Sequence, residues 1–121
     1  MEQNKKIIPL SVPNLSMEII PLLEESIRTG WISTGGRFID EFEQKVINYT
    51  GIKHAVALQN GTAGLHLALM VLDLQPEEEV IVPTVTFIAA VNPVMYMGAK
   101  PIFMDCDDSL NMDISKLEDF L

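Results

Sequence analysis

The sequence predicts an α/β fold in which helices cover both faces of a mostly parallel sheet. Three short apolar runs, at 54–58, 79–82 and 101–105, have the length and composition of buried strands. Each run leads into a helical stretch that has cap residues at its ends. Strands that alternate with helices through short turns form βαβ crossovers, and these crossovers place the strands in one parallel sheet.

Composition and charge exclude several classes of protein. The 121 residues are 48% hydrophobic and 21% charged, as expected for one globular domain, and no apolar run reaches the roughly 18 residues of a membrane span. The net charge of −9 argues against nucleic acid and anionic membranes as partners. A single cysteine, Cys106, and two separate histidines, His54 and His66, predict no metal site. The apolar region near the start, Ile7–Leu10, is too short for a secretory signal, so we expect a cytoplasmic protein.

Residues 1–15 contain two prolines and no helical period, which predicts an extended arm. Two helices are expected within 16–51. Ser16 can cap the first of them and Gly30 can end it. Pro21 lies about one turn inside, which predicts either a later start or an irregular first turn.

The second helix is predicted from apolar residues that recur at helical spacing between Phe38 and Tyr49, and Gly51 closes it. The loop 30–37 before it has three glycines and Trp31. A tryptophan in such a loop either contacts another surface or packs over the core, and the sequence leaves both interpretations open.

The stretch 54–72 reads as strand, tight turn and helix, and we expect a βαβ arrangement over the whole of 52–121. Asn60 and Gly61 can adopt the positive φ of a sharp turn, and Thr62 can act as the N-cap. The first N–H groups of a helix have no partner within it, so an anion, most simply a phosphate, is expected there. Because the glycines match neither the dinucleotide fingerprint nor the P-loop, an ordinary βα connection is the alternative.

A further helix is expected between the second and third strands. It should begin near Ile88 or Ala89, because Pro93 is tolerated only in or near a first turn, and Gly98 should end it. Ligands of parallel sheets bind beyond the carboxyl ends of the strands. The segments that leave the strands at that edge are 60–63, 83–87 and 105–108. The last helix can be capped by Asp113 or by a capping box of Ser115 and Glu118.

Four segments carry a family resemblance: GWISTGGRFIDEFE at 30–43, NGTAGLHLAL at 60–69, VPTVTFIAAVN at 82–92 and GAKPIFMD at 98–105. In order and spacing they resemble the DegT/StrS family of nucleotide-sugar aminotransferases. That family consists of homodimeric pyridoxal 5′-phosphate (PLP) enzymes of the aspartate aminotransferase fold (fold type I), and most members transfer an amino group from glutamate to a nucleotide-linked keto-sugar. The motifs are most similar to the branch that acts on UDP-linked 4-keto-6-deoxy sugars for bacterial surface glycans.

The resemblance implies roles for particular residues. The backbone of Gly61, Thr62 and Ala63 would hold the PLP phosphate, and Phe87 would stack on the pyridine ring. A loop would touch the sugar nucleotide through Gly30, Trp31, Ile32 and Ser33. Asn60 stands where many members have serine, and Pro93 also departs from the family pattern.

The resemblance also implies that residues 1–121 are the N-terminal part of the three-layer large domain. The lysine that forms the Schiff base with PLP and the aspartate that pairs with its ring nitrogen would lie beyond Leu121. No catalytic residue is therefore assigned within this chain, and we expect the 121 residues alone to be inactive. The lysines that match no family lysine are Lys5, Lys6, Lys45, Lys53, Lys100 and Lys116.

Two other functions stay open. A PLP-dependent sugar dehydratase has the same fold, with histidine in place of the missing lysine, and a binding or regulatory protein could keep the fold without the chemistry. For the full-length protein the resemblance implies a homodimer with the loop 31–37 near the interface. The helix containing 65–72 is apolar nearly all round, so the 121-residue chain should aggregate or become ordered through contacts between copies.

Overall fold

The computed structural model describes residues 7–121, so the first six residues of the predicted arm, 1–6, lie outside the described residues. The chain divides into two compact units, Met1–Ala55 and Val56–Leu121, which are described separately below. None of the helices in the described part is both long and apolar enough to cross a membrane.

The first unit contains α1 (Ile19–Thr29) and α2 (Arg37–Thr50), and residues 7–15 form neither helix nor strand. Each helix is followed by a glycine in the left-handed conformation, Gly30 at φ 76° and Gly51 at φ 75°, as the sequence predicted. Helix α1 begins later than Ser16, and Pro21 falls in its first turn, where the missing N–H has no helical partner to lose. Ser16 still contributes, because its Oγ accepts a hydrogen bond from the Glu18 N–H at 3.3 Å.

Arg37 connects the two helices of the first unit. Its guanidinium forms an ion pair with Glu25 of α1 at 3.0 Å and another with Glu41, one turn along α2, at 2.9 Å. These groups are exposed, so the pairs orient the helices more than they stabilise them. An apolar groove of about 340 Å³ lies between the helices. Its lining comes from Leu22, Leu23, Ser26, Phe38, Glu41, Phe42 and Lys45.

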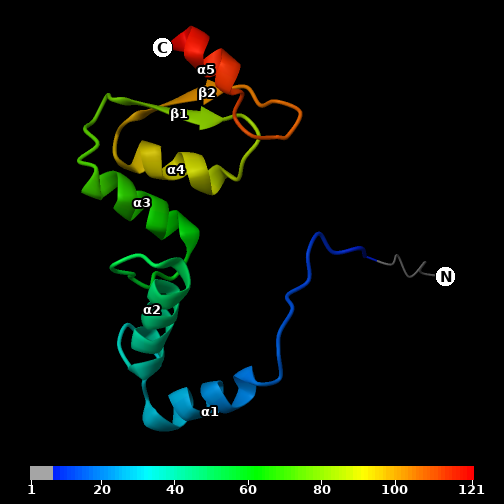
Figure 1. The fold of residues 1–121 in the computed structure, drawn as a ribbon, viewed down its shortest axis with the longest axis vertical. Coiled ribbons are helices and arrows are strands. Elements are labelled where there is room, and N and C mark those ends of the chain that lie inside the picture. Colours follow the sequence, from blue (N-terminus) through cyan, green and yellow to red (C-terminus); the bar gives the residue numbers. More distant parts are fainter. Residues whose placement is uncertain (1–6) are drawn as a thin grey trace, which may run out of the picture. The chain divides into compact units, whose positions relative to one another are not determined.

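The second unit is built around one βαβ crossover (Figure 1). Strands β1 (Glu79–Pro83) and β2 (Lys100–Met104) pair in parallel, with Glu79 opposite Lys100 and Pro83 opposite Met104. Helix α4 (Ile88–Tyr96) connects them and packs on both strands. Helix α3 (Gly61–Val71) precedes β1 and packs on α4, and α5 (Ile114–Phe120) follows β2. Two of the three predicted strands are thus confirmed.

The third predicted strand, 54–58, is wrong as a member of the sheet. Residues 54–58 form no strand, and the sheet of the described residues contains β1 and β2 alone. Its apolar side chains Val56 and Leu58 are 72% and 43% exposed. The pattern of a buried strand is present in the sequence, but a strand needs a neighbour to accept its ladder hydrogen bonds, and neither β1 nor β2 supplies one.

The core of the second unit lies between α4 and the sheet. Its buried residues are Val82, Val91, Val94, Ala99 and Met104. Pro93 is fully buried as well, at the sixth position of α4, whose predicted start near Ile88 is confirmed. The helix tolerates it because it ends three residues later and because the ring fills the core, so a lost hydrogen bond is offset by packing.

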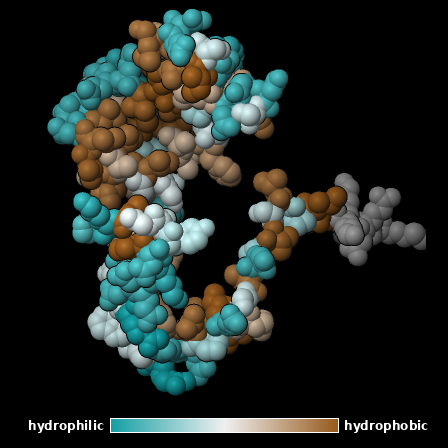
Figure 2. Space-filling view, viewed as in Figure 1, coloured by the Kyte–Doolittle hydropathy of each residue, from teal (hydrophilic) through white to brown (hydrophobic). Residues whose placement is uncertain are grey.

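Helix α3 was expected to be buried between layers, yet within the described structure none of its residues is buried. Figure 2 shows hydrophobic residues gathered on the visible surface of the second unit. On α3 the exposed fractions reach 54% for Met70 and 78% for Val71. This helix therefore presents an apolar surface to its surroundings.

Candidate active site

The carboxyl ends of β1 and β2 define one edge of the second unit. Helices α3 and α4 run opposite to the strands, so their N-terminal ends face this same edge (Figure 1). The segments 83–87 and 105–108 leave β1 and β2 at this edge, as the sequence predicted, whereas 60–63 begins α3 and follows no strand.

Asn60 is the N-cap of α3, and the assignment of that role to Thr62 was wrong. Its backbone is extended, with φ −166° and ψ 167°, and its Oδ1 accepts a hydrogen bond from the Ala63 N–H at 2.9 Å. Neither Asn60 nor Gly61 adopts positive φ, so that prediction was also wrong. An extended N-cap residue turns the chain directly into the helix, and no left-handed residue is needed.

Two backbone donors remain at the start of α3. The N–H groups of Gly61 and Thr62 have no hydrogen-bond partner among the described residues, whereas the Ala63 N–H is engaged by Asn60. Nothing lies within 4 Å of the position a Cβ would take on Gly61, so an anion can approach the backbone closely. The donor set, the open approach and the positive end of the helix dipole fit a phosphate group such as that of PLP.

Phe87 precedes α4 at the same edge. Phe87 is 80% exposed, and its carbonyl accepts the Ala90 N–H at 2.9 Å, which fixes the backbone at the start of the helix. An exposed aromatic ring held at a helix start is available to stack on a planar ligand. Phe87 and the α3 donors belong to the same unit, where they lie at the starts of α4 and α3.

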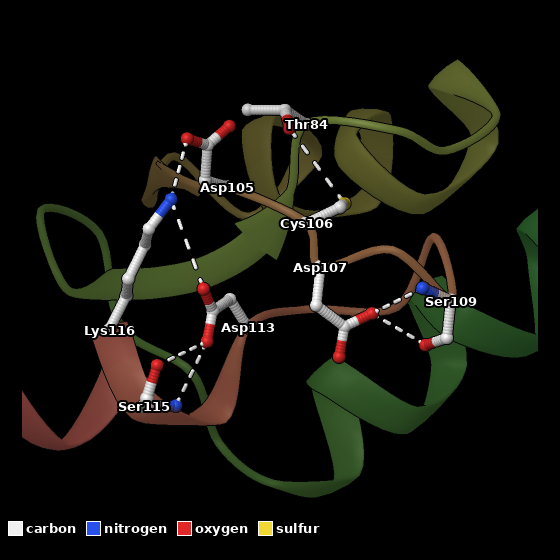
Figure 3. Close-up of polar contacts among 8 residues, drawn as sticks. All are labelled: Thr84, Asp105, Cys106, Asp107, Ser109, Asp113, Ser115 and Lys116. Carbon is white, nitrogen blue, oxygen red and sulfur yellow. Dashed lines mark hydrogen bonds and ion pairs between the residues drawn. The ribbon is translucent and has the colours of Figure 1, made fainter.

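A polar cluster that sequence reasoning missed follows the ends of β1 and β2 (Figure 3). Thr84 Oγ1 lies 3.8 Å from Cys106 Sγ, and Lys116 Nζ contacts the Asp105 carboxylate at 2.9 Å. The Asp105 hydrogen bond raises the pKa of Lys116. The sequence indicated the segment 105–108, but not its partner on α5, because residues eleven positions apart across a loop follow no local period.

Two aspartates beside this cluster are held by serines. The Ser115 hydroxyl donates to Asp113, the N-cap of α5, and lowers the pKa of that carboxyl. The Ser109 hydroxyl lowers the pKa of Asp107 in the same way. Asp113 was one of the two caps predicted for this helix.

The predicted substrate residues Gly30, Trp31, Ile32 and Ser33 lie in the first unit. Trp31 is 62% exposed, and a Cβ on Gly36 would lie 3.1 Å from the Trp31 Cβ, so the tryptophan rests on the glycines of its own loop. The two described helices of this unit contain no buried residue for it to pack over. The exposed ring and the neighbouring Ile32, 75% exposed, are accessible to a ligand or another surface.

Comparison with known proteins identifies the family. The model of the DegT/DnrJ/EryC1/StrS aminotransferase family matches residues 13–121. A GDP-perosamine synthase of Caulobacter vibrioides is 46% identical over 112 residues, which are 92% of this chain and 30% of that protein. A UDP-4-amino-4-deoxy-L-arabinose–oxoglutarate aminotransferase of Shewanella sediminis is 39% identical, with 95% and 30% covered.

The fold agrees with the sequence match. A solved structure described as a sugar aminotransferase, Spr1654 from Streptococcus pneumoniae in its PLP form, superposes with a TM-score of 0.85 at 36% identity. The superposition covers 94% of this chain and 29% of that one, and it confirms the predicted fold. The chain spans about 30% of the length of the curated relatives it matches. It belongs to the DegT/DnrJ/EryC1/StrS aminotransferase family.

Proposed function

We propose that this chain is the N-terminal part of a PLP-dependent aminotransferase that acts on a nucleotide-linked keto-sugar. The family match over residues 13–121 carries the proposal. The names of the two relatives, a GDP-sugar and a UDP-sugar enzyme, support a nucleotide sugar as substrate. The free donors at the start of α3 support the cofactor independently of the match.

The residues of this chain have two proposed roles, one in binding the cofactor and one in binding the sugar nucleotide. The Gly61 and Thr62 N–H groups would bind the PLP phosphate, and the Phe87 ring would stack on the pyridine. The segment 30–33 would contact the sugar nucleotide. When bound, PLP supplies the electron sink that amino-group transfer requires. The residues of this chain bind and orient, since the proposed lysine nucleophile would lie beyond Leu121.

Finer assignments in this proposal rest on the sequence and its resemblance. They are a UDP-linked 4-keto-6-deoxy sugar, glutamate as the amino donor, a cytoplasmic location and a homodimer. Reading the coding sequence beyond the codon of Leu121 tests the chemistry. A lysine in the matching position supports transamination, whereas a histidine there indicates dehydration, and neither residue indicates a binding role.

Cofactor binding is testable on the 121-residue chain with a matched pair of variants at Gly61. Gly61→Pro removes one proposed phosphate donor, while proline suits the first helical position and the extended Asn60 before it. Gly61→Ala keeps the donor and meets open space. We expect Gly61→Pro to weaken PLP binding by tenfold or more, since a hydrogen bond to a charged group contributes about 1.5–3 kcal/mol, and Gly61→Ala to leave it unchanged.

Equilibrium dialysis with PLP, competed by inorganic phosphate, measures this difference. Equal affinity of the two variants would contradict the assignment of the Gly61 donor. Treatment with borohydride should not attach PLP covalently to one particular lysine of this chain. A unique covalent lysine adduct, found by mass spectrometry, would show that the nucleophile lies within residues 1–121.

A further inference from the structure

The Asn60–Gly61 pair combines three features that concern the chemistry of asparagine. Both residues are exposed, and the Gly61 N–H has no hydrogen-bond partner among the described residues. Glycine has no side chain to hinder approach to its own nitrogen, and the space around it is open. Asparagines elsewhere in the described chain precede larger residues: Leu15, Tyr49, Pro93 and Met112.

We propose that Asn60 is a site of spontaneous deamidation, and that its conversion removes the anion site at the start of α3. The Gly61 nitrogen attacks Asn60 Cγ, forming the N–Cγ bond of a succinimide. The Cγ–Nδ2 bond breaks, and ammonia leaves with the proton from Gly61. Water then opens either ring carbonyl, which gives aspartate or isoaspartate at position 60.

The N-cap hydrogen bond favours the attack. Negative charge develops on Asn60 Oδ1 as Cγ becomes tetrahedral, and the Ala63 N–H already donates to that oxygen at 2.9 Å. The positive end of α3 stabilises the same charge. Ring closure turns the Asn60 carbonyl, so it breaks one backbone hydrogen bond of the helix, the one that the Gly64 N–H donates to this carbonyl at 3.2 Å.

The consequence for the site follows from charge, and it rests on the proposed function. Aspartate caps a helix as well as asparagine does, so α3 should remain intact after conversion to aspartate. Its carboxylate, however, repels a phosphate at the Gly61 and Thr62 donors. A bound phosphate conversely occupies the Gly61 N–H and should protect Asn60.

The first experiment follows the modification without any cofactor. The 121-residue chain is incubated at mildly alkaline pH, digested, and examined by mass spectrometry for conversion of amide to acid. We expect conversion at Asn60 while Asn48 and Asn111 stay intact, and loss of most of it in Gly61→Ala and all of it in Gly61→Pro. If Asn60 stays intact in the folded chain and reacts only in urea, the cap protects it and the proposal is overturned.

The second experiment tests the consequence with inorganic phosphate and PLP as probes. Either ligand should slow conversion of Asn60. Asn60→Asp should bind PLP roughly tenfold more weakly than Asn60→Ser, although both residues cap the helix. Equal affinities, or no protection by a ligand that binds, would overturn the link to the anion site. If the wild-type chain binds no PLP, the proposed function fails, while the first experiment still decides the modification.

Discussion

Two serine hydroxyls favour the ionised forms of neighbouring carboxyl groups near the end of β2. Ser115 Oγ donates to Asp113 at 2.6 Å, and Ser109 Oγ donates to Asp107 at 2.5 Å. In each case the hydrogen bond is the largest cause that lowers the pKa below the ordinary 3.8. A carboxyl whose pKa is lower in the folded state stabilises the fold above pH 3.8, and this contribution is lost as the pH falls through the folded pKa.

Ser115→Ala should therefore raise the pKa of Asp113 toward 3.8. As the pH falls, the stabilisation that ionised Asp113 gives to the start of α5 would then be lost at a higher pH than in the wild type. Ser109→Ala is the matched control, because it should raise the pKa of Asp107 and leave that of Asp113 nearly unchanged. Carboxyl chemical shifts in an NMR titration measure both pKa values. An unchanged pKa of Asp113 in Ser115→Ala would contradict the assigned cause.

The start of α3 shows what residue chemistry predicts and what it does not. The sequence located the start of the helix, because an Asn-Gly pair before a helical stretch is a local signal. It did not choose correctly between Asn60 and Thr62, since both side chains can cap a helix. The N-cap is the residue at which the extended backbone ends. That position is set by the tertiary structure around the segment and not by either residue alone.

At the scale of elements, helix ends were predictable and strand pairing was not. The glycines after α1 and α2 and the cap Asp113 were found from sequence because a cap is completed within a few residues. The segment 54–58 has the composition of a strand, but its pairing depends on residues far along the chain. The start of α4 near Ile88 was predicted correctly, whereas the burial of Pro93 was not predicted, because it depends on how the helix packs on the sheet.

Gly98, which follows α4, provides a test at this scale. Its φ is 74°, and a Cβ there would lie 3.4 Å from Pro76 Cβ. Gly98→Ala should lower the free energy of unfolding by about 1 kcal/mol or more, since a non-glycine residue in this conformation is strained. Gly61→Ala is the control, because Gly61 has an ordinary φ and open space around it, and it should change the free energy of unfolding little. Urea denaturation compares them, and equal midpoints would contradict the strain argument.

At the scale of the whole molecule, the exposed apolar surface predicts association. A groove of about 480 Å³ runs along α3, and Leu67 and Val71 on its wall are 40% and 78% exposed. The complete lining is Val56, Leu58, Gly64, Leu67, Ala68, Val71 and Leu72. Apolar surface of this kind is stable only against another surface.

Light scattering on the 121-residue chain should accordingly show species larger than a monomer. Val71→Lys should reduce association by placing a charge on the α3 surface. Tyr49→Lys, at a 93% exposed position of α2, is the control and should leave association unchanged. A monodisperse monomer with a cooperative melt would show that these residues complete their own core.

The core between α4 and the sheet has a consequence for the order of folding. All its buried members lie between Val82 and Met104, and the partly buried residues around them begin at Leu69. Contacts so close in sequence require only short loops to close, which keeps their entropic cost low. During synthesis this segment can collapse as soon as Met104 has left the ribosome, so the βαβ crossover is available early as a template on which later segments assemble.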